Sequence, residues 1–338
     1  MEAIARRLLL LFTTNMILCL THSQDFYTID IVQQSLQRAG FVAVRFNSDE
    51  FGAHCRFNYS LPGDLHGNTL LIDGQVISAS AIQAVWYRKL WDLKTPEDLD
   101  PAYRNTYLKE YNTYQQIFFN QLQDLPWMNN MQADHAVCHD KLRQLKSARA
   151  AGLTIPQTIF TNDAGLIIDF FDRCNGRLVA KLHGALSRSM EGNAAFFPTT
   201  RLTKDDLPLL DGLAYCPMIF QEYIRKAYEL RIVYVDGDFF TGKIPRGDEE
   251  VTDWRATRGR PFQWQHYTLP VTIQEKISVM MQELGLHFGA LDMIRDIDGE
   301  YVFLEVNPQG EWGMLQKDLH YPIGETIAQK LINRIKNG

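Results

Sequence analysis

The chain of 338 residues has few features of an exported, membrane-bound or nucleic-acid-binding protein. Its five cysteines, at positions 19, 55, 138, 174 and 216, form neither close pairs nor a metal-binding spacing, so reduced thiols are expected. No apolar run approaches the roughly 18 residues that suggest a membrane span. The net charge of -6 argues against nucleic acid as a partner. These absences predict a cytoplasmic protein without a membrane or nucleic-acid partner.

The first fifteen residues could be mistaken for a secretion signal. Arg6-Arg7 precedes an apolar stretch, but Thr13-Thr14-Asn15 interrupts it. The apolar residues 16–20 that follow are needed as the first strand of an α/β unit, and cleavage behind them would delete a core strand. We therefore predict that residues 1–15 form an extension outside the fold.

The most informative segment surrounds Asp298-Gly299, a pair that is typical of a two-residue turn between strands. Counting outward from such a turn pairs Asp292 with Glu305 and places Asn307 on the same face. Like charges directly opposite each other destabilise a sheet, so a divalent cation would stabilise this arrangement. Carboxylate and amide oxygens suit magnesium, which predicts a Mg2+ site here. The alternative is an exposed acidic face without a ligand.

Three upstream segments have side chains that a nucleotide site requires. Lys141 opens a helical run, and Lys181 ends an apolar strand and leads into the polar, glycine-flanked loop 183–193, which could fold over phosphates. Gln221-Glu222 ends a short apolar strand and could contact a base. Each signal has an ordinary alternative, because a lysine at a strand end is usually solvated and a glycine loop is often a simple connection.

Further segments complete an ordered set that is spread along most of the chain. The set comprises residues 20–30, 85–88, 141–145, 180–192, 216–222, 229–233, 252–255 and 304–315. This set resembles the ATP-grasp ligases and, within them, the microviridin-type (graspetide) ligases that macrocyclise peptides. Segments 21–26, 189–192 and 310–315 are more similar to the lactam-forming branch than to the lactone-forming branch.

The resemblance implies an α/β (α+β) fold, namely an ATP-grasp fold with an N-terminal pre-ATP-grasp α/β domain. We expect the pre-ATP-grasp domain at 16–130, the central ATP-grasp subdomain at 135–224 and the C-terminal subdomain with the magnesium site at 225–338. ATP is expected between the last two.

The resemblance also implies individual roles, in keeping with the affinity of compact cations for phosphates. The expected residues are Lys141, Lys181, Ser187, Ser189, Gln221, Glu222, Ile224 and Glu229 for ATP, Arg231 and Arg255 for catalysis, Asp292, Glu305 and Asn307 for magnesium, and Asp205 and Asp206 for a leader peptide. The two leader-binding acids have an alternative as helix-capping residues.

The implied reaction is activation of a carboxylate. An Asp or Glu side chain of a ribosomal precursor peptide attacks the γ-phosphate of ATP, and a Lys amine of the same peptide then displaces phosphate to close a macrolactam (isopeptide) ring. The expected cofactors are ATP and Mg2+, and the expected partners are the leader helix and core of the precursor and a second copy in a homodimer. Open alternatives are a lactone-forming graspetide ligase, a free-standing amino-acid or glutamate ATP-grasp ligase, and a non-enzymatic ATP-responsive binding module.

Overall fold

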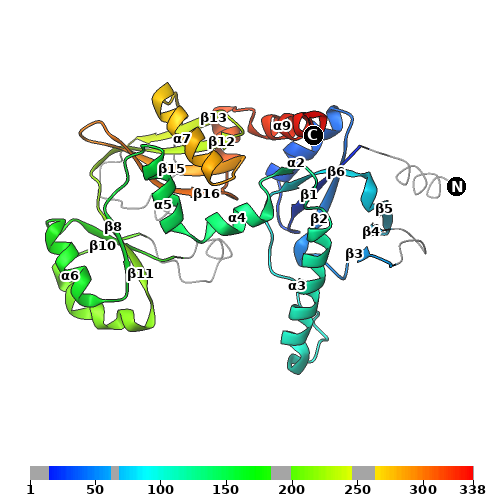
Figure 1. Cartoon of the computed structure of the whole chain (residues 1–338), viewed down its shortest axis with the longest axis horizontal. Helices are drawn as coiled ribbons and strands as arrows, with labels where there is room; N and C mark the ends of the chain where they lie inside the picture. Colours follow the sequence, from blue (N-terminus) through cyan, green and yellow to red (C-terminus); the bar gives the residue numbers. More distant parts are fainter. Residues whose placement is uncertain (1–14, 62–67, 184–198, 246–262, 338) are drawn as a thin grey trace. The chain divides into compact units, whose positions relative to one another are not determined.

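The computed structural model describes residues 15–61, 68–183, 199–245 and 263–337 (Figure 1). The chain divides into unit 1, residues 1–131 with 321–338, and unit 2, residues 132–320. Helices and strands occur in both units, which confirms the predicted α/β (α+β) class. None of the helices in the described ranges has the length and apolar character that crossing a bilayer requires.

Unit 1 contains a parallel four-stranded sheet in the order β2-β1-β6-β7. Its strands are β1 (Met16–Thr21), β2 (Val42–Asn47), β6 (Ile82–Tyr87) and β7 (Trp127–Met128). All six residues of β1 are buried, as is usual for a parallel strand covered on both faces. The apolar segment after the predicted extension is therefore the centre of a core, and residues 1–14 of the extension lie outside the described part of the chain.

Helices and a small antiparallel sheet complete unit 1. They are α2 (Thr28–Arg38), α3 (Arg104–Asn120), α9 (Ile323–Asn337), the 3-10 helices η1 (Ser48–Glu50), η2 (Ala79–Ala81) and η3 (Pro101–Tyr103), and the strands β3 (Cys55–Asn58), β4 (Thr69–Ile72) and β5 (Gln75–Ser78). The C-terminal helix α9 packs against α2 and β6 (Figure 1). Phe118 and Phe119, at the end of α3, join Phe46 and Phe57 in the apolar core.

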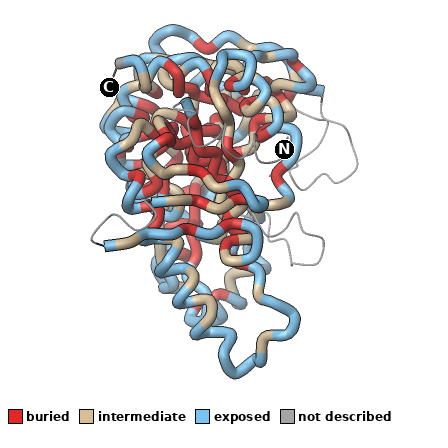
Figure 2. The backbone as a smooth tube through the Cα atoms, turned by 90° about the vertical axis from the view of Figure 1, so that its right-hand side faces the viewer, coloured by how far each residue is buried: buried red, intermediate tan, exposed pale blue. Residues whose placement is uncertain are grey.

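Unit 2 contains two antiparallel sheets with the orders β10-β9-β11-β8 and β14-β13-β12-β15-β16. The strands are β8 (Thr158–Thr161), β9 (Leu178–Lys181), β10 (Thr200–Leu202), β11 (Met218–Glu222), β12 (Lys226–Val235), β13 (Asp238–Pro245), β14 (Gln265–Tyr267), β15 (Phe288–Asp296) and β16 (Tyr301–Asn307). The helices are α4 (Met131–Cys138), α5 (Lys141–Ala150), α6 (Ala164–Arg173), η5 (Lys204–Tyr215), α7 (Val271–Glu283) and α8 (Gly313–Leu319). Apolar side chains of α6 and η5 pack on the first sheet, and those of α5 and α7 pack on the second. Figure 2 shows the buried positions in the interior and the exposed positions along the outer turns.

The hairpin between β15 and β16 has the predicted acidic pair but not the predicted turn. Asp292 lies opposite Glu305. The turn, however, has three residues, 297–299, of which only Gly299 has a positive φ (89°). The prediction of a two-residue turn is therefore wrong. Asp292 still pairs with Glu305 because Leu304 forms a β-bulge in β16. This bulge cancels the one-residue shift in register that the longer turn introduces.

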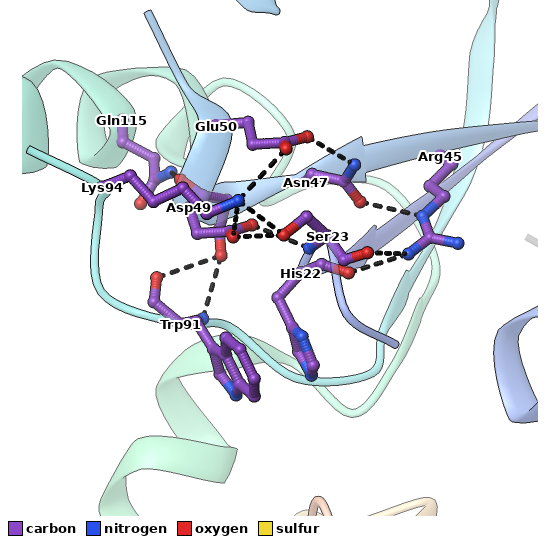
Figure 3. Close-up of polar contacts among 10 residues, drawn as sticks. His22, Ser23, Arg45, Asn47, Asp49, Glu50, Trp91, Lys94 and Gln115 are labelled. Carbon is purple, nitrogen blue, oxygen red and sulfur yellow. Dashed lines mark hydrogen bonds and ion pairs between the residues drawn. The ribbon is translucent and has the colours of Figure 1, made fainter. Parts of the chain in front are cut away.

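A polar network holds the loop that follows β1 (Figure 3). Asp49 accepts hydrogen bonds from the backbone N–H of Ser23 (2.8 Å) and from its hydroxyl (2.6 Å), and Lys94 Nζ lies 3.0 Å from the same carboxylate. Arg45, on β2, donates to the backbone carbonyl of His22 (2.8 Å). Burial lowers the pKa of His22 to about 4, so this ring is uncharged at neutral pH. Side chains from β2 and the segments after it therefore fix the carboxyl end of β1.

Candidate functional site

Strands of both sheets in unit 2 line one pocket. Its lining residues are Val179, Lys181, Thr199, Gln221, Glu222, Tyr223, Ile224, Lys226, Glu229, Asp292, Ile294, Leu304 and Glu305. Its space, including the open mouth, amounts to about 630 Å3. Seven residues that the sequence analysis selected line it, namely Lys181, Gln221, Glu222, Ile224, Glu229, Asp292 and Glu305.

Pairing of β9 with β11 brings Lys181 and Gln221 together, although 40 positions separate them. Lys181 Nζ donates to Gln221 Oε1 at 2.6 Å, and Gln221 Nε2 donates to the hydroxyl of Thr158 at 3.0 Å. The amide of Gln221 is buried, so these two hydrogen bonds set its orientation. This end of the pocket therefore presents a lysine held by an oriented amide.

The two acids of the hairpin line the pocket, and each pairs with a cation that is not among the lining residues. Arg231 Nη1 donates to Asp292 Oδ1 at 2.8 Å, and Lys141 Nζ donates to Glu305 Oε2 at 2.5 Å. Arg231 lies directly opposite Asp292 across the β12–β15 ladder, whereas Lys141 reaches Glu305 from the first turn of α5. The fold thus compensates the like charges itself, so the acidic pairing alone does not require a metal ion.

The donor set nevertheless fits magnesium. Asp292 and Glu305 lie opposite each other, and Asn307 follows two residues later on β16. The side chains of Asp292 and Glu305 keep 16% and 22% of their surface exposed, at the pocket wall. Magnesium typically takes one or two protein carboxylates together with substrate phosphates. Within the described ranges no three His, Cys, Asp or Glu side chains form a metal-binding group, so a protein-only metal cage is not present there.

Lys226 is a pocket residue that the sequence analysis missed. Its Nζ donates to Glu229 Oε1 at 2.5 Å, and both side chains line the pocket. A lysine at the start of a strand is usually solvated, so nothing in its local sequence distinguished it. Thr199, Ile294 and Leu304 also line the pocket and were not predicted, because only the fold brings them there.

Five other predicted residues are not among the described lining residues of the pocket. Ser187, Ser189 and Arg255 are outside the described residues. Asp205 and Asp206 open η5 and are not among the lining residues. Asp206 caps this helix, since its Oδ2 accepts from the backbone N–H (2.8 Å) and the hydroxyl (2.6 Å) of Thr203, and these hydrogen bonds lower its pKa. Asp206 therefore has the capping role that the sequence analysis kept as an alternative.

Asp134 is a buried carboxyl that no sequence pattern had indicated. It lies on α4 with none of its surface exposed, and its Oδ1 accepts a hydrogen bond from Gln309 Nε2 at 2.7 Å. Its Oδ2 has no hydrogen-bond partner among the described residues. Burial raises the pKa of Asp134 to about 7, and the hydrogen bond from Gln309 only partly opposes this effect.

Replacing Asp134 by Asn should stabilise the protein increasingly as the pH rises from about 4 to about 7. The folded-state pKa of about 7 exceeds the ordinary value of 3.8, so the wild-type protein loses stability across this window as the unfolded state ionises first. Below the window both states are protonated, and above it the difference is constant. The gain should reach on the order of 4 kcal/mol. Denaturant unfolding at a series of pH values measures it, and a pH-independent difference would contradict the assignment.

Comparison with known proteins agrees with the fold. The MvdD pre-ATP grasp domain family matches residues 16–135. The macrocyclase MdnB from Microcystis aeruginosa MRC is 37% identical with a TM-score of 0.80, and 94% of this chain and 99% of that chain are covered. The macrocyclase MdnC from the same organism, bound with precursor peptide MdnA, is 32% identical with a TM-score of 0.82 over 94% and 99% of the two chains. A Chryseobacterium gregarium RiPP-associated ATP-grasp ligase, in complex with ADP and a leader and core peptide, is 28% identical with a TM-score of 0.83 over 95% and 97%. No curated protein matches the chain.

These similarities and the pocket define the class of protein, an ATP-grasp ligase with a pre-ATP-grasp domain. The chain belongs to the graspetide ATP-grasp ligases. It is an ATP-dependent peptide ligase of the carboxylate–amine class. The family, the fold and the enzyme class that the sequence predicts are therefore confirmed.

Proposed function

We propose that the protein uses ATP and Mg2+ to activate Asp or Glu side chains of a ribosomal precursor peptide and closes macrolactam rings with a Lys amine of the same peptide. The observation that carries the proposal is the pocket lined by Asp292 and Glu305, which pair with Arg231 and Lys141 respectively. The macrocyclase relatives, one of them bound with a precursor peptide, support a peptide as the substrate. The lactam is favoured by the sequence segments 21–26, 189–192 and 310–315.

The nucleotide would be held along the pocket. Lys181 and Lys141 provide positive charge for the phosphates, and Ser187 and Ser189 are proposed to contact them as well. Gln221, Glu222 and the backbone of Ile224 would recognise the adenine, and Glu229 would bind the ribose hydroxyls. Lys226, which pairs with Glu229, would fix the direction of that carboxylate.

Asp292, Glu305 and Asn307 would hold magnesium, which neutralises charge on the phosphates when bound. The ammonium group of Lys141, which donates to Glu305 in this structure, would then donate to a phosphate oxygen instead, because the carboxylate and the phosphate compete for it. Arg231 is the proposed catalytic cation. Its Nη1 donates to Asp292 and its Nη2 to the carbonyl of Glu311 (3.1 Å), and these two bonds fix the guanidinium beside the metal ligands.

The proposed reaction has two steps. A carboxylate oxygen of the peptide attacks the γ-phosphorus, ADP leaves, and an acyl phosphate forms, with Arg231 and Arg255 stabilising the transferring phosphoryl group. The deprotonated Lys amine then attacks the acyl carbon, and phosphate leaves with the carboxylate oxygen. Each ring thus consumes one ATP and removes the elements of one water from the peptide.

Binding of the precursor is proposed to involve the central subdomain, 135–224, in which Asp205 and Asp206 would contact the leader helix. Asp205 is exposed at the start of η5, and Leu209, on the same helix, has 73% of its surface exposed. A pre-ATP-grasp domain at 16–130, a C-terminal subdomain at 225–338, a homodimer and a cytoplasmic location complete the proposal.

Reconstitution with ATP, Mg2+ and the precursor peptide tests this function by mass spectrometry. Ring closure should lower the peptide mass by about 18 units per ring, because condensation removes water. A gain in mass from an added free amino acid would instead identify an amino-acid ligase.

A further inference from the structure

The buried carboxyl of Asp134 does not contribute to stability in an obvious way. Its Oδ1 has a single hydrogen bond, from Gln309, and its Oδ2 has none among the described residues. A buried ionisable group that is only partly compensated destabilises a fold relative to an apolar side chain of similar volume. Another role therefore has to account for an aspartate at this position of α4.

The partner of Asp134 connects it to the proposed magnesium ligand Asn307. Gln309 donates its side-chain amide to Asp134 Oδ1 (2.7 Å) and its backbone N–H to Asn307 Oδ1 (2.9 Å). A side-chain carbonyl oxygen has two lone pairs, so Asn307 Oδ1 can accept this N–H and still coordinate a cation. The three residues thus form one hydrogen-bonded chain that ends at the ligand oxygen.

The same loop, residues 307–311, is also held by close packing at Gly310. A Cβ on Gly310 would lie 2.3 Å from the Cβ of Ala290 and 3.0 Å from Arg231 Nη2, so the loop lies directly against β15. Arg231 Nη2 also donates to the carbonyl of Glu311 at 3.1 Å. Arg231 therefore holds the loop at Glu311, and Asp134 holds it at Gln309.

We propose that Asp134 is a positioning residue that orients Asn307 through Gln309 and so raises the affinity of the site for a divalent cation. This inference rests on the proposed function, because it takes Asn307 as a metal ligand. Outer partners of metal ligands commonly set affinity in this way, by fixing the orientation of the coordinating group. The charge of Asp134 is not needed for this role, whereas its acceptor oxygen is.

Binding of Mn2+ to the full-length protein with ADP, followed by electron paramagnetic resonance, tests the proposal without turnover. Asp134→Leu should raise the Kd for Mn2+ by about 10- to 100-fold. Asp134→Asn keeps an acceptor for Gln309 and should bind Mn2+ like the wild type. Gln309→Leu should reproduce the loss, and adding it to Asp134→Leu should weaken binding little further. Gln309→Leu also decides the matter if Asp134→Leu does not fold.

Ser147→Ala is the matched control, because it removes another side-chain hydrogen bond of unit 2, the part-buried one from Ser147 to Glu283 (3.1 Å), which involves no residue of the loop. It should leave Mn2+ binding unchanged. Normal Mn2+ affinity in Asp134→Leu and Gln309→Leu would overturn the positioning role alone and leave the metal site intact. Absence of Mn2+ binding in the wild-type protein would overturn the metal site itself and the inference with it.

Discussion

Glu305→Gln should lower Mg2+-dependent ADP release by about 100-fold or more while the protein stays folded. The substitution keeps the shape of the side chain but removes one of the two carboxylates proposed to hold magnesium. Loss of an outer partner alone commonly reduces metal affinity or activity by about 10- to 100-fold, so loss of a ligand charge should have at least that effect. A coupled assay of ADP release with the precursor peptide measures it.

The same variant separates two views of the acidic pair. The sequence argument, in which Asp292 and Glu305 repel each other, would give Glu305→Gln a higher Tm without metal. The structure instead pairs Glu305 with Lys141 at 2.5 Å, so removal of the charge should lower the Tm slightly. Glu300→Gln, an exposed substitution in the same hairpin, is the matched control and should change neither ADP release nor Tm. Near-normal ADP release by Glu305→Gln would contradict the assignment of Glu305 as a magnesium ligand.

Oxygen from the peptide should appear in the released phosphate. If a precursor carries 18O in its core Asp and Glu carboxylates, the oxygen that attacks the γ-phosphorus remains on phosphate when the amine displaces it. Each ring closed should therefore give one phosphate with one 18O. Mass spectrometry of the phosphate measures the label, and unlabelled precursor in 18O water provides the control.

Ring formation with unlabelled phosphate would contradict an acyl phosphate. Arg231→Lys provides a further comparison, because lysine keeps the positive charge but lacks the planar guanidinium group. That group donates to Asp292 and to the Glu311 carbonyl at the same time. We expect this variant to slow label transfer and ring closure equally, because both depend on the same phosphoryl step.

Three Asp-Gly pairs show how far local sequence predicts the fold. Asp73-Gly74 has φ values of 46° and 78°, and Asp236-Gly237 has 46° and 97°, so both pairs form the two-residue turns that their sequence predicts. At Asp298-Gly299 the side chain of Asp296 accepts hydrogen bonds from the backbone N–H of residue 298 (3.0 Å) and of residue 300 (2.7 Å). This side chain stabilises a longer turn, which the dipeptide alone does not reveal.

In the site, sequence predicts the residue types and their places on strands better than their partners. Strand ends put Lys181 and Gln221 near a pocket, and the β15–β16 hairpin puts Asp292 opposite Glu305. The Lys141–Glu305 pair spans 164 positions, and the contact of Gln309 with Asp134 spans 175. Such pairs depend on how α4 and α5 pack on the sheet, and no local periodicity carries that information.

The type of bond formed in the reconstituted reaction decides whether the enzyme is a macrolactam ligase. We expect a product that is lighter by about 18 mass units per ring and survives mild base, because an amide resists the hydrolysis that cleaves an ester. Replacing the core Lys of the precursor by Ala should abolish ring closure, whereas replacing core Ser or Thr should leave it intact. A base-labile product, or rings that still form in the Lys→Ala precursor, would contradict the macrolactam assignment.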